Sequence, residues 1–123
     1  MYRYHKDVYI PEADSVRLEA WTERLNAGKW QYSRHCCDIL KCRTISLNAV
    51  LLFIKAVKLN AKDIFEYYTD ENNSFVKVCY RIAYTSGVDI ILVIGEDKKI
   101  ITIYMNEKND LHYTLNKSLY VRN

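Results

Sequence analysis

The chain has 123 residues, of which 50% are hydrophobic and 27% charged, and its 18 Lys and Arg against 15 Asp and Glu give a net charge of +3. This composition is ordinary for a globular protein and excludes a disordered chain, a collagen and a coiled-coil rod. No stretch approaches the roughly 20 apolar residues that a membrane-spanning helix needs, and residues 1–6 lack the apolar run of a signal peptide. We therefore expect one soluble domain over residues 1–123.

The first predicted element is a helix over residues 11–26. Pro11 suits the start of a helix, and Asp14 or Ser15 can cap it. Gly28 follows as a stop signal. Residues 30–32 are then expected to form a short connector.

Two more helices are expected before residue 60, so that the helical part spans residues 11–60. Ser33 can cap a helix over residues 33–43, and His35 lies at the flank of its apolar stripe. From residue 44 onward, apolar residues at helical spacing predict a further helix that continues through Leu59.

Four strands are predicted after the helical part. They cover residues 64–69, 75–84, 88–94 and 99–105, with polar turns at 70–74, 86–87 and 95–98 and a polar tail over 106–123. Helices followed by strands with short connections indicate an α+β fold. We expect the N-terminal helices to pack on one face of a four-stranded antiparallel sheet that spans residues 64–105.

The alternation of residues along the strands predicts which side chains share a face. In the second strand, one face is expected to carry Val76, Val78, Tyr80, Ile82 and Tyr84. In the last strand, one face is expected to carry Ile101, Ile103 and Met105. The face away from the helices then collects Lys77, Arg81, Thr102 and Tyr104. The almost wholly apolar run 88–94 predicts a central strand that is covered on both faces.

The cysteines and the first histidine carry little functional signal. We interpret the four cysteines as buried thiols in a reducing compartment, because they lack zinc-type spacing; they are Cys36, Cys37, Cys42 and Cys79. Cys79 shares a strand face with Arg81, which leaves a cysteine-based enzyme as a weaker hypothesis. His5 is expected at the surface.

Short motifs resemble those of a known superfamily. The run Tyr32-Ser33-Arg34-His35, followed by Arg43-Thr44-Ile45, is similar to the S-x-H … R-x-I helix of phage and toxin endoribonucleases of RelE-like fold. The end of the chain resembles the last strand and tail of bacterial polymorphic-toxin nucleases, through Ile101-Thr102-Ile103-Tyr104-Met105-Asn106, Asp110-x-His112-x-Thr114-Leu115 and Ser118-x-x-Tyr120. Both belong to the barnase–EndoU–colicin–RelE superfamily, which includes toxin domains of contact-dependent inhibition proteins. The resemblance covers residues 30–121.

This resemblance implies an endoribonuclease that needs no metal and no cofactor. In that superfamily the ribose 2′-OH attacks its own 3′ phosphate, which requires a base, an acid and groups that stabilise the phosphorane charge. The implied catalytic residues are His35, Arg81, Thr102, Tyr104 and His112. His35 and His112 would be the acid and base, Arg81 the phosphate clamp, and the two hydroxyls hydrogen-bond donors. The implied supporting cations are Arg43 and Lys77.

The resemblance also implies the setting of such an enzyme. The substrate would be RNA such as tRNA or mRNA, and the partner an immunity protein or antitoxin. The site of action would be the cytoplasm, without a membrane, and delivery as part of a secreted effector is compatible with it.

Two alternatives compete with this hypothesis. Arg81 can form a salt bridge to Glu66 on the neighbouring predicted strand instead of clamping phosphate. The whole domain can be a non-catalytic regulator of the same fold that binds RNA or protein. The distinction depends on whether His35 and Arg81 converge on one phosphodiester, because proton transfer requires hydrogen-bond reach.

Overall fold

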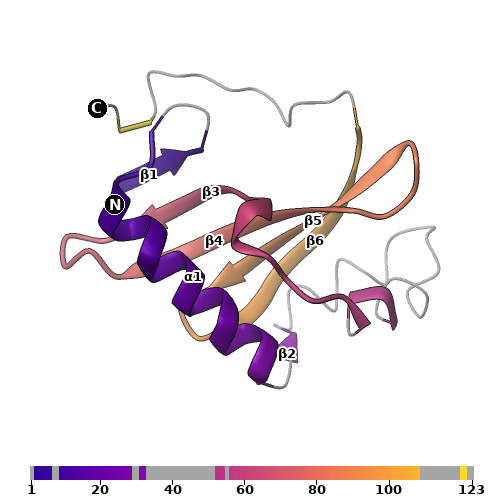
Figure 1. The fold of residues 1–123 in the computed structure, drawn as a ribbon, viewed down its shortest axis with the longest axis horizontal. Helices are drawn as coiled ribbons and strands as arrows, with labels where there is room; N and C mark the ends of the chain where they lie inside the picture. Colours follow the sequence, from indigo (N-terminus) through magenta and orange to yellow (C-terminus); the bar gives the residue numbers. More distant parts are fainter. Residues whose placement is uncertain are drawn as a thin grey trace.

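The computed structural model describes residues 2–6, 9–28, 31–32, 52–54, 56–108 and 120–121, and for residues 31, 32, 104 and 106 only the backbone. Its elements in chain order are β1 (Tyr2–His5), α1 (Glu12–Ala27), β2 (Gln31–Tyr32), the 3-10 helix η1 (Ala61–Asp63), β3 (Ile64–Thr69), β4 (Phe75–Ala83), β5 (Val88–Gly95) and β6 (Lys99–Glu107). Figure 1 shows α1 lying across one face of the sheet. Among the described residues, no helix has both the length and the apolar character needed to cross a membrane.

The sheet has six strands in the order β1-β3-β4-β5-β6-β2. The neighbours from β1 to β6 pair antiparallel, whereas the two residues of β2 pair parallel with the start of β6. The α+β class and the antiparallel β3–β6 meander are thus confirmed. The predicted number of four strands is wrong, because β1 was not predicted and residues 31–32 join the sheet instead of forming a connector.

The predicted first helix is confirmed as α1, but its N-terminus differs in detail. Pro11 occupies the N-cap position without a side-chain hydrogen bond, and the expected cap Asp14 lies inside the first turn, where it is buried. Gly28 ends the helix as predicted: its N–H donates to the carbonyls of Arg24 at 3.1 Å and Leu25 at 3.3 Å.

The other predicted helices are described only in part. The helix over residues 33–43 lies outside the described residues. Residues 52–54 and 56 are helical, but residues 57–60 are not, so the third helix does not continue through Leu59. The chain instead turns into η1, where the Asn60 side chain accepts a hydrogen bond from the Lys62 N–H at 2.9 Å.

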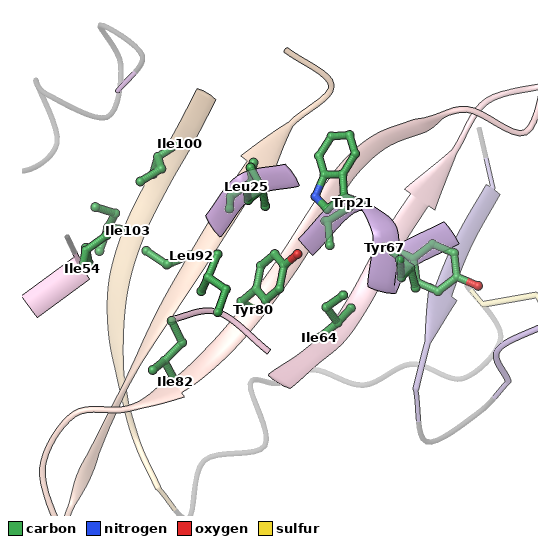
Figure 2. Packing of buried hydrophobic residues seen from close by; sticks show 14 of the residues in the cluster. Trp21, Leu25, Ile54, Ile64, Tyr67, Tyr80, Ile82, Leu92, Ile100 and Ile103 are labelled. Carbon is green, nitrogen blue, oxygen red and sulfur yellow. The ribbon is translucent and has the colours of Figure 1, made fainter. Parts of the chain in front are cut away.

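The hydrophobic core fills the space between α1 and the sheet (Figure 2). From α1 it receives Leu18, Trp21 and Leu25. From the sheet it receives Val78, Tyr80, Ile82, Ile90, Leu92, Ile94, Ile100 and Ile103, and Ile54 packs into the same cluster. The predicted alternation of β4 is confirmed from Val78 to Ile82. Phe75 also enters the core, because a register shift against β3 leaves Val76 as an extra residue and changes the pattern at the start of the strand. Ile91 faces the other way and is also fully buried, so β5 is covered on both faces as expected of a central strand.

A β-bulge changes the expected pattern of β6. The register shifts between two neighbouring pairs, Val93 with Thr102 and Ile94 with Ile100, so Ile101 is an extra residue. Ile100 and Ile103 both enter the core, whereas Ile101 lies over Gly95, where an added Cβ would come within 2.9 Å of its Cδ1. The predicted shared face of Ile101 and Ile103 is therefore wrong, because one inserted residue shifts the period of two.

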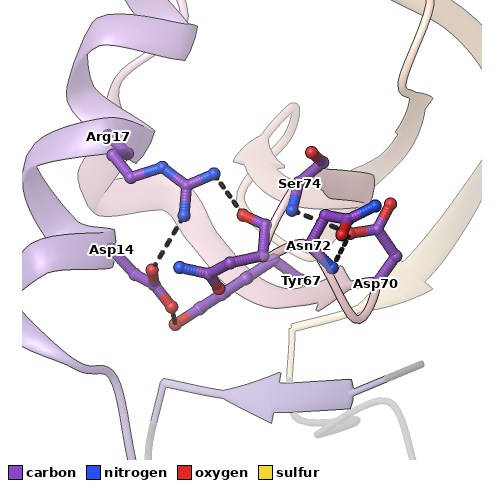
Figure 3. A network of polar contacts seen from close by, with 7 residues as sticks. Asp14, Arg17, Tyr67, Asp70, Asn72 and Ser74 are labelled. Atoms are coloured by element: carbon purple, nitrogen blue, oxygen red, sulfur yellow. Dashed lines mark hydrogen bonds and ion pairs between the residues drawn. The ribbon is translucent and has the colours of Figure 1, made fainter.

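Polar contacts fix α1 on the sheet at its first turn (Figure 3). The Tyr67 hydroxyl donates to Asp14 Oδ2 at 3.0 Å, and Arg17 Nη1 donates to Asp14 Oδ1 at 3.1 Å. Arg17 also donates to the carbonyl of Asn73, in the turn between β3 and β4. Asp70 holds that turn, since its Oδ1 accepts the N–H groups of residues 72 and 74 at 2.9 Å each. The helix is thus attached to the sheet and to a turn at once.

Two further contacts fix the rest of α1. The Thr22 hydroxyl lies 2.7 Å from the Tyr80 hydroxyl, deep in the core. The Asn26 amide donates to the Leu59 carbonyl and accepts from the Leu59 N–H, both at 2.8 Å. These contacts fix α1 to one face of the sheet along its whole length.

Candidate functional site

The sheet face that points away from α1 carries charged side chains, and we call it the outer face. Paired residues of neighbouring strands share a face, and every second residue of a strand returns to it. The register therefore assigns to the outer face Arg3, His5, Glu66, Tyr68, Lys77, Cys79, Arg81, Asp89 and Thr102.

One row of outer-face side chains runs across β1, β3 and β4. Arg3 lies opposite Tyr68, and Tyr68 lies opposite Lys77. The guanidinium carbon of Arg3 lies 4.8 Å from the centre of the Tyr68 ring, and the Lys77 Nζ lies 5.8 Å from it. Because both cations are attracted to the same ring, positive charge is held on either side of Tyr68.

The next row places a carboxylate beside an imidazole. His5 lies opposite Glu66, and Glu66 lies opposite Cys79. The Arg3 Nε lies 3.7 Å from Glu66 Oε1, which also accepts a hydrogen bond from the Tyr68 hydroxyl. We call Glu66 and the five residues around it the Glu66 cluster; the five are Arg3, His5, Tyr68, Lys77 and Tyr120.

Tyr120 reaches this cluster from the other end of the chain. Its hydroxyl donates to Glu66 Oε2 at 2.8 Å, and the neighbouring Val121 N–H donates to the Arg3 carbonyl at 3.0 Å. Figure 1 shows residues 120–121 beside β1. Glu66 is only 9% exposed as a result, yet both of its oxygens are hydrogen-bonded.

The expected surface position of His5 is wrong. Its side chain is 6% exposed, because the rings of Phe65 and Tyr120 pack edge-on against it with centroid distances of 6.1 and 5.2 Å. The buried His5 thus lies opposite the buried Glu66 on the neighbouring strand.

Burial sets the protonation of two groups in these rows. Burial, together with the hydrogen bond to Glu66 and the charge of that carboxylate, raises the pKa of the Tyr68 phenol above its ordinary value, so Tyr68 remains a donor at neutral pH. Burial and then the charge of Glu66 raise the pKa of the Cys79 thiol to about 12. A protonated thiol is a poor nucleophile, which disfavours the cysteine-based enzyme.

Arg81 forms a salt bridge, but with a different partner from the one considered. Its Nε donates to Asp89 Oδ2 at 2.8 Å, and its Nη2 donates to the Glu107 carbonyl at 3.0 Å. The Lys108 Nζ lies 2.5 Å from Asp89 Oδ1. The alternative salt bridge from Arg81 to Glu66 is therefore wrong. The strand register places Asp89 beside the end of β4, where it pairs with Arg81, whereas Glu66 pairs with Arg3.

The charge balance around Asp89 favours its ionised form. Burial acts to raise its pKa, but the hydrogen bonds and charges of Lys108 and Arg81 outweigh burial and hold the pKa below the ordinary value. Arg81 thus shares an ionised carboxylate with Lys108, and a phosphate would have to compete with Asp89 for its guanidinium.

The remaining predicted residues divide into two groups. Thr102 lies on the outer face, because it pairs with Val93 on β5, which in turn pairs with Cys79 on β4. The backbone of Tyr104 lies opposite Ile91. The predictions for His35, Arg43 and His112 fall outside the described residues. The structure therefore brings Lys77, Arg81 and Thr102 to one face, as predicted, while the roles of the other residues stay predictions.

Sequence reasoning missed the part of this face that lies at the β1 edge of the sheet. It missed Arg3, His5, Glu66, Tyr68 and Tyr120 as site residues. One signal could have found β1: residues 2–5 read Tyr-Arg-Tyr-His, which is the alternation of apolar and polar residues typical of a half-buried strand. Nothing in the local sequence of Glu66 marks it, because its partners come from β1 and from residue 120.

Two hollows lie along α1, away from the outer face. One of 440 Å³ lies between α1 and residues 58–64, and its rim carries both acids and bases, namely Glu19, Glu23, Lys6, Lys58 and Lys62. A second hollow of 660 Å³ is lined by two arginines and two acids, namely Arg17, Arg24, Glu96 and Asp97. The second hollow has as many acids as bases, whereas the first has three lysines against two glutamates.

Within the described ranges, no group of three or more His, Cys, Asp or Glu side chains is placed to hold a metal ion. No family model, no curated protein and no solved structure matches this chain.

Proposed function

We propose that the protein is a metal-independent endoribonuclease toxin of the barnase–EndoU–colicin–RelE type, and that it cleaves RNA at the Glu66 cluster. One observation carries this proposal: the Glu66 carboxylate lies opposite the His5 imidazole, in the row next to two cations held by one tyrosine ring.

RNA cleavage by transesterification needs three kinds of group. A base removes the proton of the ribose 2′-OH, and the 2′ oxygen forms a bond to the adjacent phosphorus. The bond from phosphorus to the 5′ oxygen breaks, an acid protonates that oxygen, and a 2′,3′-cyclic phosphate remains. Cations stabilise the negative charge that develops on the phosphoryl oxygens.

The Glu66 cluster contains each kind of group. We assign the base to Glu66 and the acid to His5, because residues paired across neighbouring strands have Cα atoms within roughly 5.5 Å and can serve the same phosphodiester. Arg3 and Lys77 are the cations, and the planar guanidinium of Arg3 suits two phosphoryl oxygens. The Arg3 side chain is 35% exposed, so a phosphate has access to it.

The histidines named from the superfamily motif remain the competing acid and base. The chain has three histidines, so a short series of variants separates the two versions of the site. If His5 is the acid, His5→Ala loses cleavage while His35→Ala and His112→Ala retain it. The opposite result assigns proton transfer to the motif histidines.

The direct test is incubation of the purified protein with total RNA in EDTA, with the product ends analysed for 2′,3′-cyclic phosphate. We expect cleavage by the wild type and a loss of about 10²-fold or more in kcat/KM for Glu66→Gln, the scale of one general acid–base group. Glu96→Gln, in the exposed turn before β6, is the matched control and should cleave normally. Intact RNA with the wild type at any protein concentration would overturn the proposal.

A non-catalytic RNA-binding regulator is the second candidate, and two observations favour it. Both oxygens of Glu66 already accept tyrosine hydroxyls, and Asp89 already neutralises Arg81. Such a protein would bind RNA on the outer face and release it uncut. Binding without cleavage in the same experiment would decide for this candidate.

A ribonuclease toxin acts in the cytoplasm and requires protection of the cell that makes it. We therefore include an immunity protein or antitoxin as partner, with an acidic surface that covers the cations of the outer face. Induced expression of the wild type should arrest growth, whereas Glu66→Gln should not.

A further inference from the structure

We propose that Tyr120 is a positioning residue of the Glu66 cluster, which holds the base, the acid and one cation in their relative places. This inference rests on the proposed function, since it assigns a role within the same reaction. It arises from a convergence of contacts: one side chain from the C-terminal segment contacts Glu66, His5 and Arg3.

The hydroxyl of Tyr120 acts on the carboxylate. It donates to Glu66 Oε2 at 2.8 Å, while Tyr68 donates to Oε1, so the two phenols fix the carboxylate from both sides. Each carboxylate oxygen has a second lone pair, which leaves room for a substrate hydroxyl as donor. The two hydrogen bonds therefore fix the orientation of the carboxylate that the proposed function uses as the base.

The ring of Tyr120 acts on the other two groups. Its centroid lies 5.2 Å from that of His5 in an edge-on contact, and 5.6 Å from the Arg3 guanidinium carbon. Since the same guanidinium lies 4.8 Å from the Tyr68 ring, two aromatic rings hold it. A cation fixed in this way loses less conformational freedom when it binds a phosphate.

The segment itself is attached to β1, which gives the side chain a defined origin. The Val121 N–H donates to the Arg3 carbonyl at 3.0 Å. The charged and titratable side chains that face Glu66 come from every neighbouring element: Arg3 and His5 from β1, Tyr68 from β3, Lys77 and Cys79 from β4, and Tyr120. Among them, Tyr120 is the one that links β1 and β3 from outside the sheet.

The test compares Tyr120→Phe and Tyr120→Leu with Tyr2→Phe in RNA cleavage. Tyr2, whose side chain is 49% exposed, lies on β1 but its strand position faces away from the outer face, which makes it a matched control. We expect Tyr120→Phe to lower kcat about tenfold with KM nearly unchanged, because the variant loses one of the two hydrogen bonds that orient the Glu66 carboxylate. Tyr120→Leu should also raise KM, because Arg3 loses a ring, and Tyr2→Phe should match the wild type.

The inference would be overturned if Tyr120→Phe did not slow RNA cleavage. Unchanged or faster cleavage by Tyr120→Phe would mean that Tyr120 is a bystander or a cover over the base. An NMR measurement separates this failure from that of the proposed function: the carboxyl carbon of Glu66 and the imidazole protons of His5 should shift in Tyr120→Phe but not in Tyr2→Phe. If the wild type leaves RNA intact, the proposed function fails, and the NMR shifts alone then support or overturn the positioning role.

Discussion

Asp89 shows how a guanidinium on a polar sheet face can serve the fold. Its carboxylate on β5 accepts from Arg81 on β4 and from Lys108 just after β6, so it connects three neighbouring strands at one end of the sheet. Arg81 adds hydrogen bonds to the carbonyls of residues 107 and 108. We therefore assign Arg81 mainly to the stability of this end of the sheet.

This assignment predicts a pH-dependent loss of stability in Asp89→Asn. At neutral pH the variant should lose about 1.5–3 kcal/mol of unfolding free energy, because an ionised acceptor of two cations becomes a neutral amide. The pKa of Asp89 is lowered in the folded state, so its contribution is present above the unfolded pKa and is lost as the pH falls through the folded one. The difference in Tm between wild type and variant should therefore shrink as the pH falls below about 4.

Asp97→Asn is the control for this measurement. Asp97 is exposed and its only ion pair among the described residues is with Lys99 at 3.9 Å, so its removal should change Tm little at any pH. A difference between wild type and Asp89→Asn that stays constant from neutral to acid pH would contradict the assignment.

Cys79 lies in the same row as His5 and Glu66, yet its environment makes it inert. The side chain is 6% exposed, and the pKa of its thiol is raised to about 12. On a background with the other three cysteines changed to serine, iodoacetamide at pH 8 should leave Cys79 unmodified in the native protein and alkylate it in urea. Alkylation of the native protein at the rate of an exposed thiol would return the cysteine-based mechanism to consideration.

At the scale of the elements, the sheet separates α1 from the outer face. A change in the contacts of α1 should therefore alter the stability of the fold without altering the outer face. The Tyr67 hydroxyl satisfies the buried Asp14 on the α1 side. Burial, followed by the hydrogen bond to Asp14, raises the pKa of Tyr67 above its ordinary value, so the phenol remains a donor at neutral pH.

Tyr67→Phe should therefore destabilise the fold without affecting the site. Leaving a buried carboxylate oxygen without its donor costs about 1–3 kcal/mol, which urea unfolding would detect. RNA cleavage below the transition should keep its wild-type kcat, because the lost hydroxyl lies on the opposite side of the sheet from Glu66. A matched loss of activity and stability would show that the two faces are coupled.

The elements that could be predicted are those whose residues carry their own signal. Alternation along residues 75–84 and the apolar run over 88–94 predicted β4 and β5 and the core face of β4 from Val78 onward, and Gly28 ended α1 where expected. The bulge at Ile101 could not be predicted, because it depends on pairing with β5 rather than on the sequence of β6. The two residues of β2 are too few to show any period.

At the scale of the whole molecule, the candidate site is assembled from segments far apart in the chain. Register brings residues 3 and 5 to residue 66, and residue 120 closes the group. Lys77 could be placed on this face from strand alternation alone. The proximity of Glu66 and His5 could not be predicted, because it arises from the pairing of β1 with β3, which no spacing in the sequence encodes.

The distribution of charge over the molecule leads to a prediction on salt dependence. Binding of RNA to the outer face through phosphates releases counterions, so its affinity should fall as salt rises, with a slope of roughly 0.7 per phosphate contact for single strands. Lys77→Ala should reduce the slope of log Kd against log salt by about one such contact. Lys62→Ala is the matched control, since Lys62 is equally cationic but lines the hollow beside α1. Fluorescence anisotropy with a labelled single-stranded RNA on the cleavage-deficient Glu66→Gln background measures both slopes, and equal slopes for the two lysine variants would remove the outer face as the RNA-binding surface.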